Sequence, residues 1–142
     1  MGKTVGIDYG MVRIGLAVSD DRSIMAFPLK CIQALKDHKK TAEAIIQELS
    51  KSDVDSFVIG LPLLMSGKDS DMTREVRAFA KVLEEASGKT VALWDERLTS
   101  KEIEKLLIEG NVKRKKRSKF IDPLSATLIL RSYLDSTKQL QI

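Results

Sequence analysis

Apolar and polar residues alternate along the first third of the chain, a pattern typical of β-strands. Two strands are predicted, over Thr4 to Tyr9 and Ile14 to Ser19, because their apolar side chains recur at every second position. The glycine-containing segment between them favours a tight turn, which makes the pair a hairpin. A third, short strand is expected over Ile24 to Leu29, where Pro28 is tolerated only at a sheet edge or a strand end. The chain therefore begins with three antiparallel strands.

Further along the chain the apolar spacing changes to three and four residues, which is typical of helices. Helices are predicted over Asp37 to Ser50 and over Thr73 to Ala86, the second of them closed by Gly88 as a C-terminal cap. Each is followed by a short apolar run that predicts a buried strand, Ser56 to Leu61 and Thr90 to Trp94. Strands joined through helices pair in parallel, so these two strands are expected to extend the hairpin sheet.

Two more helices are predicted in the last third of the chain. Thr99 and Glu102 form a capping box for a helix that ends before Gly110. Asp122 followed by Pro123 is typical of a helix start, with aspartate as the N-cap and proline in the first turn. The buried face of this last helix comprises Ala126, Ile129, Leu130, Tyr133 and Leu134. Residues 1–142 are expected to form one α/β domain, with a mixed five-stranded sheet flanked by helices.

The composition narrows the class of protein. The longest uncharged apolar stretch, Phe57 to Met65, is far too short to span a bilayer, so no membrane segment is expected. Asp8 lies where a signal peptide needs its apolar region, and the protein is therefore expected to be cytoplasmic. The chain has one cysteine, Cys31, and one histidine, His38. These counts exclude an internal disulfide, a structural zinc site and nuclease chemistry that depends on a histidine pair.

Positive charge is concentrated in one segment. The net charge is +4, from 24 basic and 20 acidic residues. Removing the run at 113–119 leaves eighteen basic against twenty acidic residues, a net charge of −2. A concentrated cationic segment on a near-neutral body favours a polyanionic partner, although a solvated loop would have the same composition. The cations of this run are Lys113, Arg114, Lys115, Lys116, Arg117 and Lys119.

Three acidic positions are candidates for chemistry. Asp8 follows an apolar strand and lies among glycines that let a substrate approach closely, although a turn aspartate would look the same. Asp95 and Glu96 follow the last predicted strand, and the carboxyl ends of parallel strands are where α/β proteins bind ligands; the alternative is a surface ion pair with Arg97. Asp122 is explained by capping alone, but capping and metal binding are compatible. Carboxylates without histidine or cysteine suit Mg²⁺ or Mn²⁺.

These motifs together resemble the YqgF (RuvX) family, described as Holliday junction resolvases and as nucleases that process the 5′ end of pre-16S rRNA. The resemblance implies a ribonuclease H-like fold and an acidic site made by Asp8, by the pair Asp95 and Glu96, and by Asp122. The family often has Asn and Asp where this chain has Leu64 and Ser66, so no substrate contact is carried over to those two side chains. The matching segments are GIDYGMVRIGLAVSD at 6–20, GLPLLMSGK at 60–68, WDERLTS at 94–100, VKRKKRSKFID at 112–122 and LSATLILRSYLD at 124–135.

The interpretation is a metal-dependent nuclease that hydrolyses phosphodiester bonds of structured nucleic acid. Water is expected to attack the phosphorus with the help of two divalent ions about 4 Å apart. Asp8 would bridge the ions while Glu96 and Asp122 each hold one, with Asp95 as the alternative to Glu96. The basic run would contact phosphates.

Several points stay open at the level of sequence. Arg13 and Arg97 could contact the scissile phosphate or orient carboxylates. The substrate could be RNA or a DNA junction, and a weak homodimer is not excluded. The sequence also bears on two other classes of protein. A chain of this length is too short for the two lobes of an actin-like ATPase. A nucleic-acid-binding or ribosome-assembly factor without catalysis remains, and metal-dependent turnover would discriminate it from a nuclease.

Overall fold

The computed structural model describes residues 2–98 and 117–140, with side-chain detail for 2–98 and 124–137. Its centre is one mixed sheet with the strand order β3-β2-β1-β4-β5. The first three strands are antiparallel, and the last two run parallel to β1, as the sequence pattern predicts. The strands are β1 (Lys3–Asp8), β2 (Arg13–Ser19), β3 (Ala26–Gln33), β4 (Val54–Leu61) and β5 (Thr90–Asp95).

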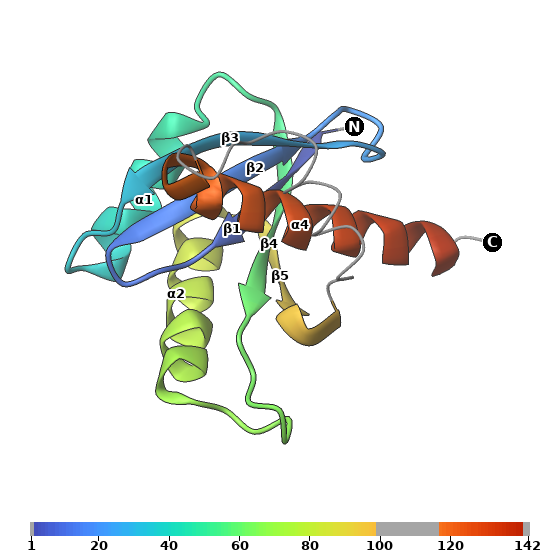
Figure 1. Ribbon diagram of the computed structural model, residues 1–142. Coiled ribbons are helices and arrows are strands. Elements are labelled where there is room, and N and C mark those ends of the chain that lie inside the picture. Colours follow the sequence, from blue (N-terminus) through green and yellow to red (C-terminus); the bar gives the residue numbers. More distant parts are fainter. Residues whose placement is uncertain (1, 99–116, 141–142) are drawn as a thin grey trace.

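Helices cover both faces of the sheet. One face packs against α1 (His38–Glu48) and α2 (Asp71–Ser87), and the other packs against α4 (Arg117–Leu140), which crosses the strands (Figure 1). A single turn of 3₁₀ helix, η1 (Glu96–Leu98), follows β5 directly. Within the described part of the chain, no helix combines the length and apolar character needed to cross a bilayer.

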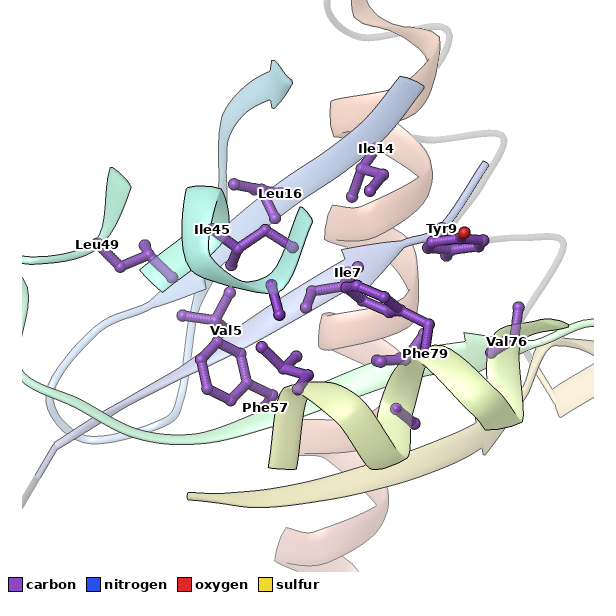
Figure 2. Packing of buried hydrophobic residues seen from close by; sticks show 14 of the residues in the cluster. Val5, Ile7, Tyr9, Ile14, Leu16, Ile45, Leu49, Phe57, Val76 and Phe79 are labelled. Carbon is purple, nitrogen blue, oxygen red and sulfur yellow. The ribbon is translucent and has the colours of Figure 1, made fainter. Parts of the chain in front are cut away.

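Each face of the sheet has its own apolar core. The larger core fills the space between the sheet and helices α1 and α2, where Ile7 of β1 lies beside Phe79 of α2 and Val5 lies beside Phe57 of β4 (Figure 2). The smaller core lies under α4, where Leu130 and Val58 are fully buried. Because strand side chains alternate between faces, the odd-numbered residues of β1 belong to the first core and the even-numbered ones face α4.

Local signals set the ends of the first two helices. The Asp37 side chain accepts a hydrogen bond from the Lys39 backbone N–H at 3.0 Å and caps α1, at the start of the range predicted for this helix. Ser70 caps α2 through a reciprocal capping box with Thr73, so this helix begins two residues earlier than the apolar pattern indicates. Gly88 ends α2 in the left-handed conformation, φ 69°, which confirms its predicted role.

The third strand differs from the prediction. It runs from Ala26 to Gln33, whereas the sequence pattern places it over Ile24 to Leu29. Pro28 lies inside it, which is possible because β3 is an edge strand and its register against β2 shifts beside Leu16. The expectation that this proline requires an edge is confirmed, but the strand continues past it.

The start of the last helix is also different. The backbone of α4 is helical from Arg117, so the prediction that Asp122 is the N-cap is wrong: this residue lies in the second turn. Arg117 and Lys119, expected in a polar loop, are likewise helical. The helix predicted to start at Thr99 and the remaining cations of the basic run, at 113–116, lie outside the described residues.

Candidate active site

Two of the predicted acidic residues lie at the carboxyl edge of the sheet, on the face covered by α4. Asp8 ends β1 and Glu96 follows the end of β5, with β4 between them. In Figure 1, β4 and β5 end beside each other and η1 continues from β5. The strand register shows how far along the sheet each acidic residue lies. Ile7 pairs with Ile59, so Asp8 is level with Gly60. Gly60 also pairs with Trp94, two residues before Glu96.

Asp8 faces α4 because of its position in β1. Gly6, two residues earlier, lies directly under α4: a Cβ atom there would come within 2.7 Å of the Leu130 Cβ and 2.9 Å of the Ala126 carbonyl oxygen. Alternation puts the half-buried Asp8 side chain on the same face. Its neighbour across the hairpin is Gly15. Asp8 therefore has a glycine beside it in each neighbouring strand, Gly15 in β2 and Gly60 in β4.

Glu96 reaches over β4 toward the same space. A Cβ atom on Gly60 would lie 2.6 Å from the Glu96 Oε1 atom and 2.5 Å from the Ile129 Cδ1 atom. The carboxylate therefore rests on the bare backbone of Gly60, on the side of the sheet to which Asp8 points. Burial raises the pKa of Glu96 above its ordinary value, and the charge of Asp95 raises it further.

Asp95 has a different environment from its neighbour. Its carboxylate accepts hydrogen bonds from the Arg97 backbone N–H at 2.9 Å and from the Arg97 Nη2 atom at 2.7 Å. The hydrogen bond from the Arg97 side chain is the main cause that lowers the pKa of Asp95. Arg97 also donates to the Met65 carbonyl oxygen at 3.3 Å. The structure thus places Glu96 over Gly60 and pairs Asp95 with Arg97, which in turn ties η1 to the loop after β4 through the Met65 carbonyl.

A polar network holds the end of β1 from the opposite face. The residue after Asp8, Tyr9, is buried and stacks on Phe79, and its hydroxyl lies 3.2 Å from the His38 Nε2 atom. The same nitrogen lies 2.7 Å from the Glu75 Oε1 atom. Burial, with the charge of Glu75, raises the pKa of Tyr9. These contacts link β1 to both α1 and α2, and they fix the backbone that carries Asp8.

The remaining predicted site residues are placed less completely. Arg13 begins β2 and is exposed, just across the hairpin turn from Asp8. Asp122 lies on the α4 backbone, but its side chain and those of Arg117 and Lys119 are outside the described detail. Sequence reasoning did not single out Gly60 as a site residue. The signal was available, because a glycine inside an apolar strand often marks a close approach by another group.

The donor set suits a hard divalent cation. Asp8 and Glu96 offer carboxylate oxygens, and the cost of ionising a buried Glu96 beside Asp95 would be offset by a cation. Among the residues whose side chains are described, no three potential ligands converge on one point. A third protein ligand, if the site has one, must therefore come from outside that set, and Asp122 is the candidate from the sequence.

Known proteins that resemble this chain in sequence are named as nucleases. A model of the RuvX family, described as "Holliday junction resolvase", matches residues 2–136. A protein of Protochlamydia amoebophila (strain UWE25), named "Putative pre-16S rRNA nuclease", is 44% identical over 140 residues, which cover 94% of this chain and 93% of the relative. A protein of the same name from Koribacter versatilis (strain Ellin345) is 40% identical, over 94% of this chain and 87% of the relative.

Solved structures resemble the whole chain in fold. The RuvC protein of T. thermophilus, in complex with a Holliday junction substrate, superposes with a TM-score of 0.61 at 14% identity, covering 98% of this chain and 96% of that one. The Fowlpox virus resolvase with its Holliday junction DNA gives a TM-score of 0.59 at 14% identity, covering 95% and 98%. At such low identity, the superpositions show a common fold and nothing more. This common fold confirms the predicted ribonuclease H-like architecture.

Proposed function

The chain belongs to the RuvX family of Holliday junction resolvases, a family of nucleases, and from that premise we propose that it hydrolyses phosphodiester bonds of structured RNA with the help of Mg²⁺ or Mn²⁺. The observation that supports the proposal is the position of Glu96 over the backbone of Gly60, together with a register that makes Asp8 level with Gly60 in the neighbouring strand. The substrate that we favour is pre-16S rRNA, because the two relatives at 44% and 40% identity are named for it. The family resemblance in the sequence favours the 5′ end of this RNA as the place of cleavage. The reaction would take place in the cytoplasm, in one domain spanning residues 1–142.

We assign the third carboxylate to Asp122. This residue precedes Ala126 by one helical turn, and the Ala126 carbonyl is part of the closest approach of α4 to β1 at Gly6. Residues one turn apart share a helix face, so position 122 lies on the face that α4 turns to the sheet.

Each residue then has a distinct task. Asp8, Glu96 and Asp122 would hold the cations, which when bound would activate water and neutralise charge on the leaving oxygen. Arg97 keeps Asp95 and the loop after β4 in place, so we assign it and Asp95 a positioning role. Arg13 and the basic run, Lys113 to Lys119, would contact substrate phosphates.

The test is cleavage of a pre-16S rRNA fragment with Mg²⁺, with Mn²⁺ and with excess chelator. We expect cleavage only with metal, and Asp8→Asn should reduce it by orders of magnitude because an amide is a poor ligand for a hard cation. The matched control is Asp55→Asn, an exposed aspartate on β4 that lies toward the opposite end of the sheet. Cleavage that persists in chelator, or in a folded Asp8→Asn protein, would remove this site from the reaction.

A second candidate substrate is the DNA four-way junction. It is favoured by the description of the family model and by the two superposed resolvases, both of which are bound to Holliday junctions. Parallel assays on the rRNA fragment and on a four-way junction decide between them. A protein that binds either probe but cleaves neither with any divalent metal would instead be a binding or ribosome-assembly factor without catalysis.

A further inference from the structure

An apolar tip projects from the molecule beside the candidate site. The tip consists of Leu64 and Met65, in the loop that leaves the carboxyl end of β4 and extends well past the sheet before α2 (Figure 1). Met65 is 93% exposed and Leu64 is 48% exposed. Folding gains little from apolar side chains that stay in water, so the tip needs an explanation other than the stability of the fold.

The tip is held in place by a small hairpin. Leu63 and Asp69 form a β-bridge, the Leu64 N–H donates to the Lys68 carbonyl at 3.0 Å, and the Gly67 N–H donates to the Leu64 carbonyl at 2.8 Å. Gly67 has φ 86°, the left-handed conformation that such a tight turn requires. These bonds fix the backbone of the loop, so its two apolar side chains are presented outward in a defined direction.

The base of this hairpin is fastened to the helix that follows and to the site itself. Arg77 of α2 donates to both carboxylate oxygens of Asp69, at 3.0 and 3.2 Å. Arg97 donates to the Met65 carbonyl at 3.3 Å, and it is the residue next to Glu96. The Arg97 side chain therefore joins the tip to Asp95, the residue before Glu96, at the edge of the sheet where the candidate site lies. A substrate whose phosphate reached that edge would bring its neighbouring bases toward the tip.

Charge and chemistry indicate which part of a nucleic acid would meet the tip. The exposed cation Lys68, in the same loop, suits phosphates, whereas Leu64 and Met65 offer nothing to a phosphate or a sugar hydroxyl. Apolar side chains gain from nucleic acid by packing on the flat face of a base. In an uninterrupted duplex those faces are covered by stacking, and only polar edges are open.

Resting on the nuclease function proposed above, we propose that the apolar tip packs against the face of an unpaired base next to the phosphate to be cleaved. The tip would make the protein select places where a duplex is interrupted, such as a single-stranded extension, a bulge or a branch. It would add no recognition of sequence, because the face of any base can pack against it.

The experiment measures binding in chelator, so that no cleavage occurs, to two RNA probes of equal length. One is an uninterrupted duplex, and the other is a duplex with a single-stranded extension whose first unpaired base is 2-aminopurine, a fluorescent reporter of stacking. We expect the parent to prefer the interrupted probe and to change its fluorescence. The double variant Leu64→Ser, Met65→Ser should lose roughly tenfold in affinity for that probe alone, with the fluorescence change abolished.

Two further variants sharpen the result. Met25→Ser with Phe27→Ser is the matched control, because these apolar side chains on and beside β3 are 45% and 48% exposed and lie away from the site; it should behave like the parent. Met65→Trp supplies a larger flat surface and should tighten binding to the interrupted probe about threefold or more.

Three outcomes would overturn the proposal. The double variant could lose affinity equally for both probes, it could keep the full preference of the parent, or the control could lose the preference as well. The second outcome would indicate that the tip contacts another kind of partner, such as a protein. A parent that binds neither probe and also cleaves no RNA with Mg²⁺ or Mn²⁺ would refute the proposed function along with the tip. A parent that cleaves RNA with metal but binds neither probe in chelator, or shows one of the three outcomes, refutes the tip alone.

Discussion

At the scale of single residues, the most informative contrast is between the neighbours Asp95 and Glu96. Sequence reasoning narrowed the site to this pair but could not choose between them, because the choice depends on where the strand ends. β5 ends at Asp95 and the chain turns at once into η1, which directs Glu96 over Gly60. Arg97 then engages Asp95. The result comes from tertiary geometry that no spacing of residues encodes.

The contrast predicts unequal effects of two conservative substitutions. Glu96→Gln should reduce cleavage by orders of magnitude, because it removes a ligand. Asp95→Asn should reduce it far less, because that residue acts only through Arg97. Steady-state cleavage rates of the two variants, compared at equal concentrations of folded protein, check the prediction. Equal losses would show that the pair acts as one ligand group.

The same Glu96 variant should be more stable without metal. A carboxyl group whose pKa is raised on folding lowers stability once it ionises, so the parent loses stability as pH rises through that raised pKa, and glutamine does not. In chelator, the melting temperature of Glu96→Gln should therefore exceed that of the parent at neutral pH, and the two should converge in acid. Added Mn²⁺ should raise the parent's melting temperature more than the variant's.

At the scale of elements, β4 contributes to the site through Gly60, because the absence of a side chain there leaves space for Glu96. Gly60→Ala would place a methyl group within 2.6 Å of the Glu96 Oε1 atom and 2.5 Å of the Ile129 Cδ1 atom. We expect a loss of about 1 to 3 kcal/mol in unfolding free energy from overpacking, together with a large loss of cleavage as Glu96 is displaced. Denaturant unfolding and cleavage rates measure the two effects.

Gly88→Ala is the matched control for this change. This substitution should lower the free energy of unfolding by about 1 to 2 kcal/mol, because the backbone of Gly88 has the left-handed conformation. The added Cβ atom would contact nothing within 4 Å, so it leaves the site undisturbed. Cleavage per folded molecule should be normal in this variant. If Gly60→Ala also cleaved normally, the position of Glu96 over β4 would be irrelevant to the reaction.

The helices and strands show which features of the fold can be predicted from the pattern of apolar residues. The order of strands and helices and the cap at Gly88 could be predicted, because each depends on local patterning. The start of α4 could not. Asp122 followed by Pro123 is a strong start signal, yet no glycine or proline separates it from Arg117, and the helix continues upstream. The length of β3 likewise depends on its pairing with β2, which tolerates Pro28 only because the strand is at the edge.

At the scale of the whole molecule, the distribution of charge predicts how binding depends on salt. Each phosphate contact contributes roughly 0.7 to 0.9 to the slope of log affinity against log salt concentration. Replacing all six cations of the basic run with Gln should therefore flatten the slope by several units and weaken binding to every sequence alike. Cleavage at saturating substrate should persist, since the carboxylates are intact. Titrations at several salt concentrations test this, and an unchanged slope on both RNA and junction DNA would refute the contact.

The strand order has a consequence for how the spacing of the two acids is maintained. β1 and β5 are separated by one strand, so their backbones lie about 10 Å apart, twice the interval of the inter-strand hydrogen bonds. That interval is a property of the peptide group, and no exchange of side chains in either core alters it. The separation of β1 and β5 is therefore fixed by the hydrogen bonds of the sheet. Substitutions among the apolar core residues change the stability of the fold, whereas the distance between the strands that lead to the two acidic residues stays the same.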